Sequence, residues 1–255
     1  MYTSEDIRRV QRRLLEMAVV IRDILESHNI PYFITYGTLL GAVRHQGFIP
    51  WDDDFDFYLF DDSYDKAIHA LRAEMPVNMF LEDEESEPLY FHGWAHVKDT
   101  GTEALCELFP QDNLYTHHGI SIDLYRAYKI KKSEDRLNRL NAHIKYLNRK
   151  LNKGLISFEV FLNKKNDIVQ DISIEQQQLL INDTSKDEDW IGFISVFNDS
   201  MPAKDLFPLK KYKFEKQDFW GPSNAEVLLK ACYGDYMCLP PEEKRKPHYS
   251  EVLFK

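Results

Sequence analysis

The sequence is poor in cysteine, and its three cysteines form no CxxC pair: Cys106, Cys232 and Cys238. An odd number of cysteines is a poor basis for a disulfide framework, which favours reduced thiols in a cytoplasmic protein. No apolar run approaches the ~20 residues of a membrane-spanning helix. The charged start, MYTSEDIRRVQRRLL, lacks the apolar centre of a signal peptide. We therefore expect a soluble protein that is at most peripheral to the cytoplasmic face of the inner membrane.

The chain also lacks an excess of positive charge, because 32 Lys and Arg face 42 Asp and Glu, a formal net charge of −10. Such a protein does not hold nucleic acid by bulk attraction to phosphate, so we expect no nucleic-acid partner. Hydrophobic residues make up 44% of the 255 positions, enough for a sizeable core. With no internal repeat and no Gly/Ser linker, the sequence predicts a single α/β domain of the α+β type over residues 1–255.

Hydrophobic periodicity predicts the order of elements in the first half of the chain. A helix is predicted over 5–28, capped by Thr3 or Ser4. The run YFITYG then reads as a strand closed by Gly37, and TLLGAVRH as a short helix that Gly47 ends. Further along we predict a helix over 63–74, an acidic loop over 82–88, and strands in YFHGWAHVKD and GISIDLYRAY.

A mostly helical subregion is predicted over residues 130–205. Residues 126–165 carry twelve Lys or Arg against three acids, opposite in sign to the whole chain. One interpretation is a solvated face of helices. The alternative is a surface that holds an acceptor carried on a lipid pyrophosphate, or that contacts the anionic inner leaflet, with Arg139, Lys145 and Arg149 as contributors.

The segment WDDDFDFYLF, residues 51–60, concentrates negative charge where a strand begins. Alternation puts Asp54 and Asp56 on one face and the two phenylalanines between them on the other. Carboxylates this close repel one another unless a cation lies among them. Two aspartates at alternate positions suit Mg²⁺, and Asp123 on a neighbouring strand is the candidate base. Asp52 and Asp53 could equally belong to a solvated loop.

A glycine-threonine step precedes this segment by one helix. Gly37 and Thr38 close a strand and open a helix, so backbone N–H groups and the helix dipole point outward where a phosphate could bind. The step and the Asp-x-Asp strand together predict a site for a phosphorylated substrate and one or two Mg²⁺ or Mn²⁺ ions.

The individual residues of this region are more specific evidence than the order of its predicted elements. GTLLGAVRHQGFIPWDDDFDF closely resembles the defining motif of the LicD family, bacterial phosphocholine transferases with a nucleotidyltransferase fold whose distant relatives include fukutin and fukutin-related protein. AHVKDTGT is similar to the family's lysine strand, GISIDLY to its third-aspartate strand, and FWGPSNAEVLLKACYGDYMCLPPEEKRKPH to its C-terminal pattern. The segment after the third aspartate departs from the family by reading Arg126, Ala127, Tyr128.

The resemblance implies a mixed sheet flanked by helices and a Mg²⁺-dependent transfer of phosphocholine from CDP-choline to a glycan sugar, on a teichoic acid, lipopolysaccharide or capsule precursor that can be lipid-linked. A ribitol or glycerol phosphate donor is the alternative. The implied catalytic residues and metal ligands are Asp54, Asp56 and Asp123. The implied substrate-binding residues are Gly37, Thr38, Arg44, Trp51, Asp52, Trp94, Lys98 and Tyr125.

Several of these residues have a second interpretation. Arg44 and Lys98 would donate to phosphate, but Arg44 could instead pair with an aspartate, and Lys98 could be a surface residue. Trp51 could be core packing rather than a platform for cytosine. Trp94, Tyr125 and Trp220 are candidate walls for a trimethylammonium group, which binds aromatic faces. His92, His96, His117 and His118 are not assigned to a metal.

Overall fold

The computed structural model describes residues 2–106, 112, 114–130, 143, 146–168, 190–193 and 200–255. The chain forms two compact units, which are described separately. Unit 1 comprises Met1–Arg126 and Asp205–Lys255, and unit 2 comprises Ala127–Lys204. Every aspartate that the sequence singles out belongs to unit 1.

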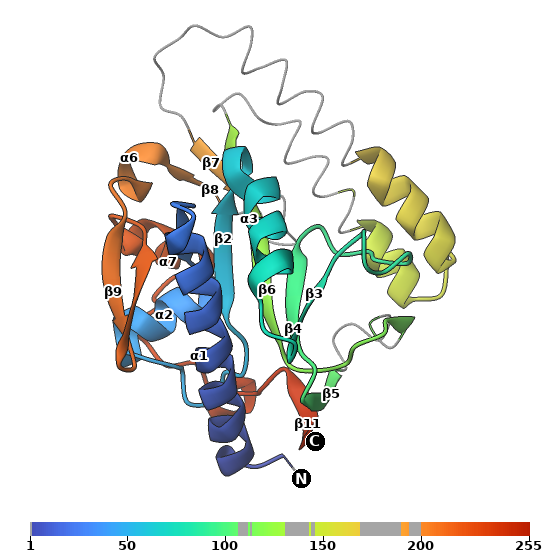
Figure 1. Cartoon of the computed structure of the whole chain (residues 1–255), viewed down its shortest axis with the longest axis horizontal. Coiled ribbons are helices and arrows are strands. Elements are labelled where there is room, and N and C mark those ends of the chain that lie inside the picture. Colours follow the sequence, from blue (N-terminus) through green and yellow to red (C-terminus); the bar gives the residue numbers. More distant parts are fainter. Residues whose placement is uncertain are drawn as a thin grey trace, which may run out of the picture. The chain divides into compact units, whose positions relative to one another are not determined.

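A mixed sheet forms the centre of unit 1, with its strands in the order β1-β2-β6-β4-β3 (Figure 1). The strands are β1 Tyr32–Ile34, β2 Asp56–Phe60, β3 Met79–Glu82, β4 Ala95–Asp99 and β6 Ser121–Ile130. In unit 2 the last residues of β6 pair with β7 Trp190–Phe193, which pairs with β8 Ser200–Pro202. With helices flanking the sheet, the predicted α/β fold of the α+β type is confirmed.

Helices pack on this sheet and on a hairpin beside it. Helix α3, Asp61–Glu74, contacts β2 and β3 and packs against α1, Ser4–Ser27. Helix α2, Tyr36–His45, contacts β2, the hairpin strand β9 and helix α7. The remaining elements of unit 1 are α6 Ala203–Leu206 (at the unit boundary), β9 Lys210–Phe214, β10 Gln217–Gly221, α7 Ala225–Tyr233 and η2 Glu242–Lys244.

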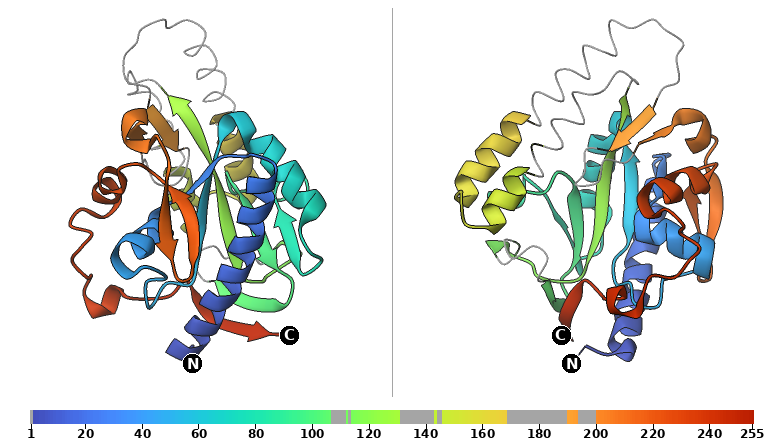
Figure 2. Two further views of the ribbon diagram at one scale, coloured as in Figure 1. Left: turned by 60° about the vertical axis from the view of Figure 1, so that its left-hand side comes forward. Right: turned by 180° about the vertical axis from the view of Figure 1, so that it is seen from behind.

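The C-terminal strand returns to the start of the chain. Strand β11, Tyr249–Phe254, pairs antiparallel with β5, Thr102–Cys106, in a small separate sheet. The two termini lie at the same end of unit 1 in every view (Figures 1 and 2). The segment just before β11 is thereby brought back to the loop that precedes β2, where the aspartates are.

The N-terminal helix follows the prediction closely. Thr3 caps α1 in a capping box with Asp6, which satisfies backbone donors at the helix start. The predicted apolar stripe is buried, and Asn29 just beyond the helix has a φ of 53°. Arg13 on α1 donates to Asp99 of β4 at 2.8 Å, so a buried ion pair also holds the helix on the sheet.

Helix α2 ends at His45 as predicted but begins at Tyr36, two residues early, so the strand stops at Ile34 and Gly37 lies inside the helix instead of closing the strand. The residue with left-handed backbone is Gln46, with a φ of 56°, and not Gly47. Gly47 meets a different demand, because a Cβ there would lie 2.8 Å from the Glu215 side-chain oxygen of the β9–β10 turn. The backbone N–H of Glu215 also donates to the Gln46 carbonyl at 2.7 Å. A tertiary approach, rather than the helix end, therefore requires the glycine.

The predicted acidic loop over 82–88 begins one residue too early. Glu82 is the last residue of β3 and is fully buried, and the loop proper starts at Asp83. In unit 2, residues 146–152 and 158–168 are helical within the stretch predicted as a helical subregion. Arg139 and Lys145 lie outside the described residues, and an acceptor-side role for 130–205 stays a prediction.

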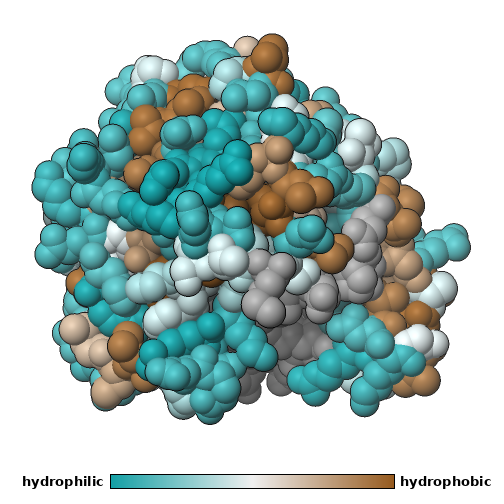
Figure 3. Space-filling view, turned by 90° about the horizontal axis from the view of Figure 1, so that it is seen from below, coloured by the Kyte–Doolittle hydropathy of each residue, from teal (hydrophilic) through white to brown (hydrophobic). Residues whose placement is uncertain are grey.

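An aromatic cluster fills the core between β2 and the β9–β10 hairpin. Phe55 and Phe57 are fully buried, and both rings pack against Phe219, at 5.2 and 6.0 Å between centroids. Phe214 and Phe48 complete the cluster. Exposed apolar side chains form separate groups on a mainly hydrophilic face (Figure 3). Among the helices of the described ranges, none is both long and apolar enough to cross a membrane.

Truncating this cluster should destabilise the protein. We expect Phe219→Ala to lower the free energy of unfolding by about 3–5 kcal/mol, because it removes a fully buried ring and leaves a cavity beneath β2. Urea denaturation followed by circular dichroism measures the change. Val77→Ala, at a side chain that is 99% exposed, is the control and should change stability little. Equal effects of both substitutions would contradict this core.

Candidate active site

Four carboxylates gather where the loop after α2 enters β2. Asp52 and Asp54 lie in that loop, Asp56 begins β2, and Asp123 lies on the neighbouring strand β6. The backbone N–H of Asp123 donates to the carbonyl of Phe55 at 3.0 Å, which ties the loop to β6. Since Phe55 points into the aromatic core, alternation leaves the aspartates on either side of it facing the opposite way.

Burial and mutual repulsion raise the pKa of every member of this group. Burial, followed by the charges of Asp54 and Asp123, places the pKa of Asp56 well above its usual range. Burial also raises the pKa of Asp52, and the charge of Asp54 is the second cause of that shift. The pKa values of Asp54 and Asp123 are also raised, by burial first. An uncompensated cluster of this kind costs free energy at neutral pH.

The donor set fits a hard divalent cation. One side-chain oxygen of Asp54 is buried and has no hydrogen-bond partner within the described part of the chain. Carboxylate oxygens are the ligands that Mg²⁺ and Mn²⁺ take in proteins. Asp54, Asp56 and Asp123, the predicted ligands, lie close enough for each charge to raise a neighbour's pKa. Their role as metal ligands stays a prediction.

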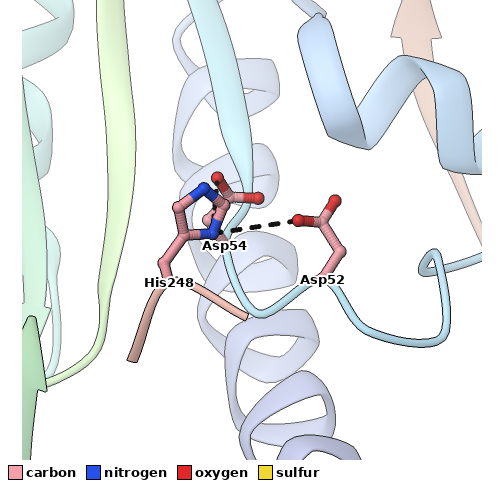
Figure 4. A group of neighbouring side chains, drawn as sticks. All are labelled: Asp52, Asp54 and His248. Carbon is pink, nitrogen blue, oxygen red and sulfur yellow. Dashed lines mark ion pairs between the residues drawn. The ribbon is translucent and has the colours of Figure 1, made fainter. Parts of the chain in front are cut away.

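His248, the last residue of the family-like C-terminal pattern but given no role from the sequence, faces the same carboxylates. Nδ1 of His248 lies 3.2 Å from Asp53, 3.5 Å from Asp54 and 3.9 Å from Asp52 (Figure 4). Asp54 raises the pKa of His248 to about 11, so the ring is protonated at neutral pH and acts as a counter-ion. Asp52, Asp54 and His248 also place three side-chain atoms within 4.8 Å of one another, a geometry open to a metal ion only if the His248 ring gives up its proton.

Asp53 stabilises this arrangement through buried or partly buried hydrogen bonds. Its fully buried carboxylate accepts hydrogen bonds from the backbone N–H groups of His248 and Tyr249, at 2.7 and 3.2 Å, and from the hydroxyl of Tyr2 at 3.1 Å. Asp53 thus binds both ends of the chain to the loop. The interpretation of Asp52 and Asp53 as a solvated loop is wrong, because the Asp52 side chain is only 14% exposed.

The first turn of α2 lies against the loop. A Cβ on Gly37 would lie 2.6 Å from a carboxylate oxygen of Asp52, so any larger residue there would displace the Asp52 side chain. Thr38 is buried, and its hydroxyl accepts the backbone N–H of Asp56 at 2.8 Å. Tyr36 has a φ of 42°, a strained value for a tyrosine. Phosphate binding by Gly37 and Thr38 stays a prediction, while their observed role is to position the aspartates.

A second polar group lies beside Asp123 on the sheet. His96 of β4 has Nε2 3.3 Å from Asp123 and Nδ1 3.1 Å from Glu82 of β3. Lys98 has Nζ 3.7 Å from Glu82. Burial raises the pKa of Glu82 to about 7 and lowers the pKa of His96 to about 4. Lys98 is 6% exposed, so its interpretation as a surface residue is wrong.

Two of the other predicted residues, Arg44 and Trp51, contact the C-terminal segment of the chain. The guanidinium of Arg44 donates to the backbone carbonyls of Tyr236 and Cys238, at 2.6 and 3.4 Å, and so holds the C-terminal loop. Trp51 is half-buried, and the guanidinium of Arg245 lies over its ring, 5.3 Å from the ring centroid.

Two buried aromatic rings lie beside the third aspartate. Tyr125 donates its hydroxyl to Asp123 at 2.9 Å, and its ring centroid lies 4.8 Å from that of Trp94. Trp220 on β10 instead packs with the ammonium of Lys211. Tyr125 therefore contacts the carboxylate group directly, and Trp94 contacts Tyr125. Trp220 contacts Lys211 instead.

Comparisons with known proteins find similarity over the segment that carries Asp52, Asp54 and Asp56. Residues 29–86 match the model of the LicD/FKTN/FKRP nucleotidyltransferase domain. The chain is 27% identical over 241 residues to the lipopolysaccharide cholinephosphotransferase LicD of Haemophilus influenzae, covering 91% of each protein. It is 41% identical over 49 residues to the human ribitol 5-phosphate transferase FKRP, 19% of this chain and 10% of that protein. An uncharacterized protein of Rickettsia prowazekii is 65% identical over 34 residues, 13% of each.

Removing the charge of Asp53 should loosen both chain ends. We expect Asp53→Asn to lower the free energy of unfolding by about 1.5–3 kcal/mol, because an amide cannot accept all the donors that the buried carboxylate accepts. Urea denaturation measures the loss, and trypsin should then cleave faster at Lys244–Lys246. Asp62→Asn, at an exposed position of α3, is the matched control. Unchanged stability in the Asp53 variant would show that these bonds do not hold the C-terminus.

Proposed function

The chain belongs to the LicD family, and from this premise we propose that it transfers phosphocholine from CDP-choline to a sugar hydroxyl of a cell-surface glycan precursor, releasing CMP. The acceptor would be a teichoic acid, lipopolysaccharide or capsule precursor, and the reaction would take place on the cytoplasmic side of the inner membrane. The observation that carries the proposal is the partly buried group of Asp52, Asp54, Asp56 and Asp123, whose raised pKa values call for a cation, which in turn would bind a phosphate.

In the proposed reaction the sugar oxygen attacks the phosphorus that carries choline. A bond forms between them, and the bond from that phosphorus to the bridging oxygen of CMP breaks, so CMP leaves with the electron pair. Asp123 would accept the proton of the sugar hydroxyl, because it comes from β6 rather than from the segment that carries Asp54 and Asp56, and its side chain is partly exposed, at 22%. Asp54 and Asp56 would hold Mg²⁺, which when bound offsets the charge on the pyrophosphate and the leaving CMP.

The remaining residues of the site would position the substrate. Gly37 leaves room beside Asp52 in the first turn of α2, where a helix N-terminus favours phosphate. Arg44 and Trp51 both contact the C-terminal segment of the chain. Arg44 donates to the carbonyl of Tyr236, and the Trp51 ring lies beside Arg245. Lys98 would donate to a phosphate oxygen, and its contact with Glu82 orients it until substrate binds.

The identity of the transferred group is the finer part of the proposal. Trp94 packs against Tyr125, whose hydroxyl donates to Asp123, and an aromatic face suits a trimethylammonium group. The similarity to a ribitol 5-phosphate transferase supports an alternative in which CDP-ribitol, or CDP-glycerol, is the donor. Other classes have less support, since the net charge of −10 disfavours a nucleic-acid substrate and intact carboxylates disfavour a noncatalytic binding protein.

CMP release from matched donors tests the proposal. With a cell-envelope glycan extract as acceptor, we expect turnover of CDP-choline above CDP-ribitol and CDP-glycerol, and loss of turnover without Mg²⁺. Asp54→Asn should reduce kcat/KM by at least ~100-fold, because one metal oxygen is lost, while the exposed Asp62→Asn should have no effect. Turnover of CDP-ribitol alone would select the alternative. A folded protein that turns over none of the three donors would overturn the proposed function.

The raised pKa values also predict how stability depends on pH. Carboxyl groups whose folded pKa lies above the unfolded 3.8 contribute stability that is lost as pH rises through the folded values. His248 acts in the same direction above pH 6.5. His96, whose pKa is lowered to about 4, is neutral in the folded state, so it opposes the trend only near pH 6.5, where the unfolded histidine is still partly protonated. The metal-free protein should therefore lose stability between pH 6.5 and 8.

Mg²⁺ or Mn²⁺ should reverse this loss, because the ion binds the deprotonated carboxylates. At a free metal concentration of about 100 times Kd, the stabilisation is about 2.7 kcal/mol, or roughly 5–11 °C in Tm for a chain of this size. The increment should be larger at pH 8 than at pH 6.5, and Asp54→Asn should remove it. Differential scanning fluorimetry in EDTA and in metal measures both effects. An equal increment at the two pH values would argue against a carboxylate site.

A further inference from the structure

Three adjacent strands of the sheet place one polar side chain each in a single row. Glu82 of β3 is the register partner of His96 of β4, and His96 is the register partner of Asp123 of β6. Directly opposed residues on neighbouring strands point their side chains to the same face and lie close enough to interact. The row therefore leads from the buried edge of the sheet, at Glu82, to the carboxylate group at Asp123.

Both ring nitrogens of His96 are engaged within this row. Nε2 lies 3.3 Å from one oxygen of Asp123, and Nδ1 lies 3.1 Å from Glu82 and 3.1 Å from the hydroxyl of Tyr90. That hydroxyl donates to the carbonyl of Trp94 at 2.6 Å, so Tyr90 is itself fixed. His96 is 4% exposed and Glu82 is fully buried, so water does not compete for these contacts. The ring has little freedom to rotate.

Asp123 has a neighbour at each of its oxygens. Nε2 of His96 lies 3.3 Å from one oxygen, and the Tyr125 hydroxyl donates to the other at 2.9 Å. These two contacts limit the rotation of the carboxylate relative to Asp54 and Asp56. Lys98, with Nζ 3.7 Å from Glu82, offsets the charge at the far end of the row. The two contacts to Asp123 resemble the outer partners that orient metal-binding carboxylates in proteins.

We infer that His96 is a positioning residue, which holds Asp123 toward the other aspartates while Glu82 fixes the ring from behind. The inference rests on the proposed function for the role of Asp123 but not for the identity of the donor. His92 offers a matched comparison, because it is similarly buried and its ring centroid lies 4.5 Å from that of His96. Its Nε2 is directed to Asp112, at 2.8 Å, rather than to the aspartates.

Two amide substitutions separate positioning from packing. In His96→Gln the side-chain amide reaches the place of Nε2 and can still donate to Asp123. In His96→Asn the amide reaches only the place of Nδ1, so it keeps the contact toward Glu82 and leaves Asp123 untethered on that side. The two variants are alike in polarity, and both replace an aromatic ring in the same pocket. His92→Asn controls for the loss of a buried imidazole.

Mn²⁺ binding, followed by electron paramagnetic resonance without substrate, is the first readout. We expect His96→Asn to weaken Mn²⁺ binding by about 10–100-fold, as loss of an outer partner does, and His96→Gln and His92→Asn to stay within about 3-fold of the unsubstituted protein. With a turned-over donor, His96→Asn should lower kcat by a similar factor and leave KM for the donor nearly unchanged. Urea denaturation of all three variants reports any purely structural loss.

The outcomes distinguish this inference from the proposed function. Weaker Mn²⁺ binding in His96→Asn alone supports the positioning role even if no CDP-alcohol is turned over. Three outcomes overturn it: Mn²⁺ binding unchanged in His96→Asn, equal weakening in His92→Asn, or no Mn²⁺ binding by the unsubstituted protein. Should His96→Asn fail to fold, Glu82→Gln tests the same row from its other end, and normal Mn²⁺ binding by that variant would count against the row.

Discussion

The repulsion between buried carboxylates is the constraint on which the rest of unit 1 depends. Asp52, Asp54, Asp56 and Asp123 have raised pKa values because they are taken out of water together, and this arrangement is unfavourable unless cations compensate it. The protein supplies one such charge from His248, whose own pKa is raised by Asp54. The remaining excess of negative charge is what the proposed divalent ion would compensate, and a phosphorylated ligand would bind through that ion.

Neutral hydrogen bonds and one buried acid keep this group from dispersing. The side-chain amide of Gln11 on α1 donates to the carbonyls of Ile49 and Asp52, at 3.0 and 2.8 Å, and so holds the loop from the helix side. Thr38 fixes the backbone of Asp56, and Asp53 fixes the segment that carries His248. The aromatic core behind Phe55 then prevents the loop from turning over, because a shift by one residue would bury an aspartate in its place.

Contacts within a short stretch were predictable from the sequence. Alternation in DFDF placed Asp54 and Asp56 on the face opposite Phe55, and the capping residue and apolar stripe located α1 within about one residue of its observed ends. These features depend on periods of two and 3.6 residues, which a single sequence displays. Asp123 joined the group because GISIDLY carries one acid in a strand pattern.

Contacts across the chain were not predictable in the same way. His248 and Asp53 are 195 positions apart, and nothing local in RKPHYS shows that β11 pairs with β5 and returns to the loop. Glu82 was assigned to a loop because β3 has only four residues and runs into an acidic stretch, too short for alternation to be read. Similarly, the row through His96 depends on the registers of two strand pairs, which tertiary packing sets and the sequence of one strand does not.

The distinction between local and long-range contacts also applies to the proposed reaction. The residues proposed for its chemistry are mostly close in sequence, whereas those proposed to select the transferred group are far apart. Residues 29–86, which match the family model, contain α2, the aspartate loop, β2, α3 and β3, and so supply every member of the carboxylate group except Asp123. Trp94, Tyr125 and the C-terminal loop held by Arg44 lie mostly beyond that segment. In the proposed reaction, the contacts to metal and phosphate would therefore come mainly from one continuous stretch, whereas the choice between a quaternary ammonium and an alditol would depend on Trp94, Tyr125 and the C-terminal loop.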